Sequence, residues 1–169
     1  MLLSILPSIS LAFGESEETW SGNRTNQTID GGTHTITLSN LTIDSPGLGK
    51  SAIDITGNAD VTFILEGNNT LSGRPNHPAI WVQSGSSVTF EGTGTLNTSA
   101  GGTTPGFGAA GIGGGYGASS NFGNITINGG TIIARGSGGG AGIGGGYEVG
   151  SGTVTGNVTI NGGYVTAIG

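Results

Sequence analysis

The chain has 169 residues, of which 38 are glycine, and its formal net charge at pH 7 is −6. With 4 lysines and arginines against 10 acids, it lacks the basic patch that binding to nucleic acid or to an anionic membrane needs. The absence of cysteine excludes a disulfide framework and thiolate metal sites.

The N-terminal stretch has the composition of an export signal. Residues 1–12 (MLLSILPSISLA) are apolar and place small residues at Ser10 and Ala12, the spacing that signal peptidase prefers. We expect a signal peptide at 1–12, and the missing basic start leaves open a truncated signal or, alternatively, an apolar first strand. Residues 13–27 are expected to form an irregular lead-in. The apolar stretch is too short to span a bilayer, so no membrane insertion of the mature chain is expected.

The remaining region, 28–169, is built from repeats. The motif AGIGGGY occurs at Ala110–Tyr116 and again at Ala141–Tyr147, and NITINGG at Asn124–Gly130 recurs as NVTINGG at Asn157–Gly163. Weaker copies precede these, and each carries a V-T-F run followed by a T-L pair. Every unit thus offers short strands separated by Gly, Asn or Ser turns.

Strands this short cannot form long hairpin pairs with their neighbours in sequence. Stacked coils, in which each strand pairs with its counterpart in the next coil, are the arrangement that buries their apolar residues. We predict an all-β fold, namely a right-handed, single-stranded parallel β-helix, a Gly-rich solenoid of about five rungs with three short strands per rung. The last coil would leave an open strand edge at Gly169. We therefore expect the stack to continue beyond this fragment, into further rungs or into another copy stacked end to end.

Alternation predicts which side chains face the core. The apolar residues of one parity are Ile53, Ile55, Val61, Phe63, Leu65, Ile80, Val82, Val88, Phe90, Ile125, Ile127, Val158 and Ile160. Threonines of the other parity would form an outward column of Thr62, Thr89, Thr126 and Thr159. In the glycine-rich segments, Ile112 and Ile143 remain as the buried residues.

Four segments resemble those of secreted bacterial carbohydrate-binding-domain or GAGIGGG-repeat proteins: GNADVTFILEGNNTLSG, HPAIWVQSGSSVTFEGTGTLNTS, GAAGIGGG and GNITINGGTIIARG. The resemblance covers roughly residues 28–169. It implies a right-handed parallel β-helix in modular cell-surface proteins, some of which bind calcium and plant-type polysaccharides. No calcium-ligand motif of that family can be matched in this chain residue by residue.

Two sets of residues are candidates for ligand binding. Alternation places Asp54 and Trp81 outward, one above the other, and an indole beside a carboxylate suits a sugar, whose apolar face meets the ring while its hydroxyls meet the acid. The alternative is that Trp81 only packs under the loop 74–78. Tyr116 and Tyr147, which end the two AGIGGGY copies, form a second candidate aromatic stack.

A metal site is conceivable at Glu66 and Glu91. If ILEG and TFEG are equivalent, these two carboxylates occupy the same corner of adjacent rungs, where a shared Ca²⁺ would relieve their repulsion. The alternative is two exposed turn glutamates pointing apart. In the next rungs the equivalent residues are Asn128 and Asn161, which would stack as a hydrogen-bonded amide ladder.

The sequence therefore favours a non-catalytic, secreted or cell-surface carbohydrate-binding module, with calcium as its conceivable cofactor and a polysaccharide or cell-surface glycan as its partner. A structural repeat stalk of an adhesin is the alternative, followed by a polysaccharide lyase or hydrolase and an ice-binding protein. We do not expect an enzyme, because Arg135, a potential base, lies far along the chain from the acids. Ice-binding faces usually have paired threonines on each strand, and in this sequence only Thr35 and Thr37 form such a pair.

Overall fold

The computed structural model of the chain describes residues 10–11, 16–44, 49–102, 105–117, 120–147 and 153–169. All but the last three residues of the expected signal peptide 1–12 precede these ranges, and Ala12 also lies outside them, so the signal peptide stays a prediction. Within the described ranges the regular elements are β-strands.

The strands form two sheets within the part of the chain that the structure describes. The six-stranded sheet has the order β1 (Ser10–Leu11), β3 (Gln27–Asp30), β5 (Ile53–Thr56), β8 (Ile80–Val82), β11 (Ile112–Gly113) and β14 (Ile143–Gly144). The ten-stranded sheet has the order β15 (Asn157–Ile160), β12 (Asn124–Ile127), β9 (Ser87–Gly92), β6 (Asp60–Glu66), β4 (Thr33–Asp44), β7 (Asn68–Pro75), β10 (Thr95–Gly101), β13 (Thr131–Arg135) and β16 (Tyr164–Ile168). Its remaining strand, β2 (Ser16–Asn23), pairs with β4.

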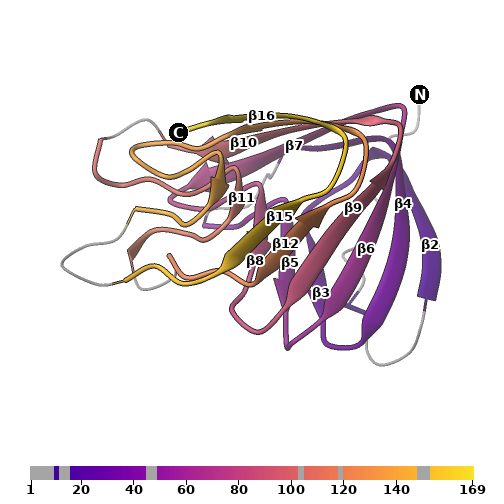
Figure 1. Ribbon diagram of the computed structural model, residues 1–169, viewed down its shortest axis with the longest axis horizontal. Coiled ribbons are helices and arrows are strands. Elements are labelled where there is room, and N and C mark those ends of the chain that lie inside the picture. The colour runs from indigo at the N-terminus through magenta and orange to yellow at the C-terminus, as the bar shows by residue number, and fades with distance from the viewer. Residues whose placement is uncertain (1–9, 12–15, 45–48, 103–104, 118–119, 148–152) are drawn as a thin grey trace.

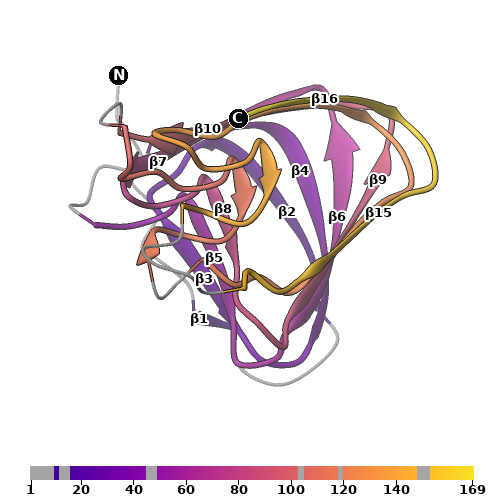
Figure 2. The same cartoon turned by 60° about the vertical axis from the view of Figure 1, so that its left-hand side comes forward.

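The prediction of a β-helix with three short strands per rung is wrong. Strand β4, with 12 residues, pairs with β6 through its first part and with β7 through its last part. The second and third strands of the units are thereby joined in one sheet, which curves like half a barrel while the six-stranded sheet lies across its open side (Figure 1 and Figure 2). The fold is all-β with parallel strands, closer to a β-sandwich or roll than to a three-sided coil.

The core lies between the two sheets and follows the predicted alternation. Eleven of the predicted core residues have no more than 1% of their surface exposed: Ile53, Ile55, Val61, Phe63, Leu65, Ile80, Val82, Val88, Phe90, Ile125 and Ile127. Two predictions are wrong, because Val158 is 41% and Ile160 55% exposed on the last strand pair of the stack. Both continue buried columns, since Val158 is in register with Ile125 and Ile160 with Ile127.

Repeated positions are in register, as the repeats predict. Ile112 pairs with Ile143 across β11 and β14; Ile112 is fully buried, whereas Ile143 is only partly buried. The outward column contains Thr35, Thr62, Thr89, Thr126 and Thr159, each paired with the next. Like positions of successive units therefore lie one strand apart, which is the condition on which every site prediction depends.

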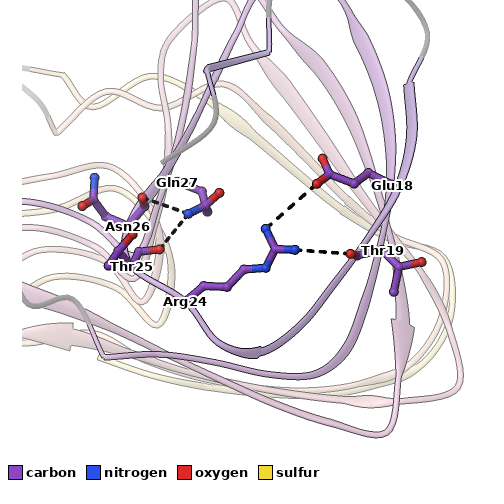
Figure 3. Close-up of polar contacts among 6 residues, drawn as sticks. All are labelled: Glu18, Thr19, Arg24, Thr25, Asn26 and Gln27. Carbon is purple, nitrogen blue, oxygen red and sulfur yellow. Dashed lines mark hydrogen bonds and ion pairs between the residues drawn. The ribbon is translucent and has the colours of Figure 1, made fainter. Parts of the chain in front are cut away.

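The N-terminal end of the stack is covered by polar side chains. The stretch 13–27, for which we expected an irregular lead-in, contains β2, whose Trp20 is only 1% exposed. The Arg24 guanidinium lies 5.6 Å from the centre of the Trp20 ring, and its Nη1 is 3.9 Å from a Glu18 carboxylate oxygen. Arg24 also donates to the Thr19 carbonyl at 3.4 Å (Figure 3). An ion pair thus covers the core at this end.

Candidate functional site

A pocket of about 280 Å³ brings together two of the residues that the sequence selected. Trp81 comes from β8, and Tyr116 follows β11 by three residues. The loop after β7, under which Trp81 would pack in the alternative interpretation, forms another wall. The residues that line the pocket are Asn76, His77, Pro78, Trp81, Gly115 and Tyr116. The sequence analysis did not select Asn76, His77 or Gly115.

Backbone hydrogen bonds hold these walls in place. The His77 N–H donates to the Arg74 carbonyl at 2.8 Å, which closes a turn after β7. The Tyr116 N–H donates to the Asn76 carbonyl at 3.2 Å, so that the two sides of the pocket are joined directly. The His77 carbonyl in turn accepts from Gly101 at 3.2 Å. The loop is therefore anchored by main-chain groups, and its side chains remain available.

The donor and acceptor roles of the two ring nitrogens of His77 follow from its contacts. Its Nδ1 lies 3.1 Å from the carbonyl oxygen of Pro75. Because a carbonyl only accepts hydrogen bonds, Nδ1 carries a hydrogen, and in the neutral ring Nε2 is an acceptor. Protonation would turn Nε2 into a second donor. His77 can thus bind a hydroxyl group in either of its charge states.

Asp54 and Trp81 lie side by side, as predicted. They are register partners in β5 and β8, and Trp81 is paired on its other side with Gly113 of β11. Gly113 is paired in turn with Gly144, so the column continues without side chains. No side chain therefore stands beside the indole in the next strand, on the side where Gly115 lines the pocket.

The polar atoms of this pair are buried and incompletely satisfied. Burial raises the pKa of Asp54 above the usual 3.8, against opposing effects of the Ser51 hydroxyl and of the charges on Lys50 and His77. Among the residues that the structure describes, neither Oδ1 of Asp54 nor Nε1 of Trp81 has a hydrogen-bond partner. A buried acceptor and a buried donor thus lie in neighbouring strands next to the pocket.

The two tyrosines form a stack, as the repeat predicts, but only one of them lines the pocket. The ring centres of Tyr116 and Tyr147 are 6.4 Å apart and the planes are 9° from parallel. Phe107, which the sequence analysis did not select, is exposed and lies 5.2 Å from Tyr116, ring centre to ring centre. Tyr147 does not line this pocket, and it contacts the ring of Tyr116 from outside the lining.

The alignment that placed Glu66 beside Glu91 is wrong. The V-T-F runs set the register of β6 and β9, so Phe63 pairs with Phe90 and Glu91 pairs with Ile64. Glu66 lies two residues further along and pairs with Ser39 instead. Both glutamates are exposed. The pair offers no shared corner for Ca²⁺.

The amide ladder that was predicted beyond Glu91 is confirmed. Asn128 Nδ2 donates to Glu91 Oε1 at 3.4 Å, and Asn161 Nδ2 donates to Asn128 Oδ1 at 2.9 Å. A second ladder joins Asn157 Nδ2 to Asn124 Oδ1 at 3.0 Å. Within the described ranges, no group of three His, Asp or Glu side chains is arranged to hold a metal ion.

A second hollow lies on the outer side of the ten-stranded sheet. Its volume is about 320 Å³, and it is lined by Glu18, Thr19, Thr35, Thr37 and Ile64. Thr35 and Thr37 are the threonine pair noted in the sequence. This hollow has no aromatic lining among the described residues, in contrast to the Trp81 pocket.

No family model matches the chain, and the searches of curated proteins and of solved structures likewise give no match. Helices long and apolar enough to cross a membrane do not occur among the residues that the structure describes.

Proposed function

We propose that this chain is a non-catalytic carbohydrate-binding module of a secreted or cell-surface protein, with the Trp81 pocket as its binding site. The observation that carries the proposal is that Trp81 and Tyr116, from successive units, line one pocket together with the polar side chains of Asn76 and His77. Its volume lies near the lower limit of ordinary ligand pockets, about 300 Å³, which suits one sugar ring.

The chemistry of the wall matches a sugar. Indole and phenol rings offer apolar surface to the C–H face of a sugar ring, and the phenol O–H of Tyr116 binds its hydroxyls. The Asn76 amide both donates and accepts, and the His77 Nε2 accepts in the neutral state. Trp81 Nε1 is buried, so the contribution of Trp81 to the pocket is the surface of its ring.

Binding is favoured over glycoside hydrolysis because few acidic groups lie near the pocket. Hydrolysis commonly uses two carboxyl groups that flank the scissile bond. The described lining includes neither Asp nor Glu, and the nearest carboxylate that the register brings to it is the single Asp54. Glu66 and Glu91 belong to the other sheet.

A structural stalk is the second candidate function. It is favoured by the in-register threonine column and by the two asparagine ladders, which run along the stacking direction. Such features fix the length and stiffness of a repeat without any ligand. The two functions make opposite predictions about the Trp81 pocket.

The deciding experiment is a glycan array followed by calorimetric titration of each hit. We expect the wild-type chain to bind at least one glycan and Trp81→Ala to weaken that binding about tenfold or more, which corresponds to about 1.4 kcal/mol. Tyr164→Ala removes an exposed aromatic ring on β16 and is the matched control, with unchanged affinity. Failure of the wild-type chain to bind any glycan would contradict the proposal and leave the stalk.

A further inference from the structure

An exposed aromatic ring lies directly beside the Trp81 pocket. Phe107, which precedes β11, is 48% exposed. Its ring centre is 5.2 Å from that of Tyr116, and the two ring planes are 30° apart, an ordinary geometry for an aromatic contact. Tyr116 itself belongs to the pocket wall. The aromatic lining of the pocket therefore continues from Tyr116 onto the exposed ring of Phe107.

Main-chain hydrogen bonds on both sides of Phe107 hold this ring in place. Before it, the Gly106 N–H donates to the Gly138 carbonyl at 2.9 Å. After it, the Gly108 carbonyl accepts from the Tyr147 N–H at 2.9 Å. Both partners belong to the following unit of the stack. The segment that carries Phe107 is thus fixed before any ligand arrives, so binding to its ring requires little ordering of the protein.

The pocket can hold only one part of an extended ligand. Its volume of about 280 Å³ suits one sugar ring, so a run of linked sugars has to continue outside it. The wall formed by Tyr116 extends beyond the pocket, because Phe107 adjoins it. An exposed phenyl ring can take the C–H face of a second sugar in the way that Trp81 and Tyr116 take the first.

A sugar fits this surface better than another protein does. A stable protein interface buries about 800 Å² on each partner, whereas a whole aromatic side chain buries only about 150–250 Å². One exposed ring of that size matches the face of one sugar. The polar side chains of Asn76 and His77 in the adjoining pocket also match a ligand that is rich in hydroxyl groups.

We propose that Phe107 and Tyr116 form a second sugar-binding subsite, so that the protein binds a run of linked sugars, an oligosaccharide or polysaccharide, and not a single sugar. This inference rests on the proposed function, because the first sugar occupies the Trp81 pocket. The next sugar of the same ligand lies against Phe107. Since both contacts belong to one ligand, the affinity rises with the number of sugars until both subsites are filled.

Calorimetric titration with sugars of increasing length tests this proposal. The probes are homologous series of glucose, xylose, mannose, galactose and galacturonate, from the monosaccharide to the tetrasaccharide. The wild type is expected to bind the oligosaccharides of at least one series about threefold to tenfold more tightly than the monosaccharide. Phe107→Ala should bring this ratio of affinities close to one, and Phe107→Tyr, which keeps the ring, should retain it. Tyr164→Ala, which removes an exposed ring from β16, is the matched control and should keep the wild-type ratio.

The ratio separates a subsite from a purely structural role of Phe107. If Phe107 only supports the ring of Tyr116, Phe107→Ala weakens the binding of monosaccharide and oligosaccharide by the same factor, and the proposal is overturned. Equal affinity of the wild type for every length overturns it as well, while leaving the Trp81 pocket as a site for a single sugar. If no sugar of any length binds, the proposed function fails together with this inference. Circular dichroism shows whether each variant is folded, and Phe107→Leu repeats the test if Phe107→Ala is not.

Discussion

Asp54 and Trp81 are direct register partners in neighbouring parallel strands, and each keeps one buried polar atom without a hydrogen-bond partner in the described part of the chain. Unsatisfied buried groups reduce stability and are rare in folded proteins. The two atoms lie in adjacent strands next to the pocket, where each reduces the stability of the fold.

The first prediction concerns the stability effect of Asp54. Because burial raises its pKa, the folded chain binds this proton more tightly than the unfolded chain does. Stability is then greatest below the usual pKa of 3.8 and falls as the pH rises through the raised pKa. Asp54→Asn, which cannot ionise, should increase the free energy of unfolding at neutral pH and give no such gain below that pKa. Urea unfolding at a series of pH values measures this.

The control for that experiment is Asp44→Asn, which removes an exposed carboxylate from β4. We expect no comparable gain from it at any pH. If Asp54→Asn destabilised the chain at neutral pH, Asp54 would be held by partners that outweigh its burial.

A second prediction concerns the glycine next to Trp81. Gly113 has a φ of 130°, and a Cβ at this position would collide with the backbone carbonyl of Gly144. Gly113→Ala should therefore lower the free energy of unfolding by about 2 kcal/mol or more. Gly117→Ala is the control, since its φ of 66° is also positive but a Cβ there meets nothing within 4 Å. Its expected cost is only about 1 kcal/mol. Equal losses would show that close packing at Gly113 is unimportant.

The asparagine ladder yields a third prediction. Asn128→Asp replaces the amide that donates to Glu91 with a second carboxylate, so a hydrogen bond is exchanged for repulsion. Because both side chains are exposed, we expect a loss of only about 0.5–1 kcal/mol at neutral pH, smaller in high salt and at acidic pH. Denaturant unfolding at two salt concentrations checks it.

Asn124→Asp serves as the matched substitution for that series. Its carboxylate can still accept from Asn157, and its register partner on the other side is Ser87 rather than an acid. The salt-dependent loss should therefore be smaller than for Asn128→Asp. A larger loss at position 124 would mean that Glu91 does not determine the effect.

The register of many strands was predictable, because similar motifs in successive repeats lie next to each other. Identical motifs place Ile112 beside Ile143, and alternation selects the buried side of each run. What the sequence does not reveal is that β4 runs unbroken from Thr33 to Asp44. The Asn40 that lies there adopts a φ of 52°, so the chain bends without ending the strand. Two sheets result in place of three.

The candidate site was predictable only in part. Trp81 and Asp54 could be placed together because strand alternation fixes both, whereas His77 and Asn76 belong to a turn that has no periodicity. The error at Glu66 has a similar cause. Local likeness between ILEG and TFEG suggested one alignment, but burial of Phe63 against Phe90, ring centres 5.9 Å apart, determined another.

Whether the Trp81 pocket binds a sugar can be read from tryptophan fluorescence. The chain has 2 tryptophans, and Trp20 is buried beneath Arg24, so a ligand in the pocket should alter the emission of Trp81 alone. Titration with a glycan identified on the array should change the emission of the wild type saturably and leave Trp81→Phe unchanged. A saturable change that persists in Trp81→Phe, or binding by calorimetry without any change in the wild type, would contradict the claim.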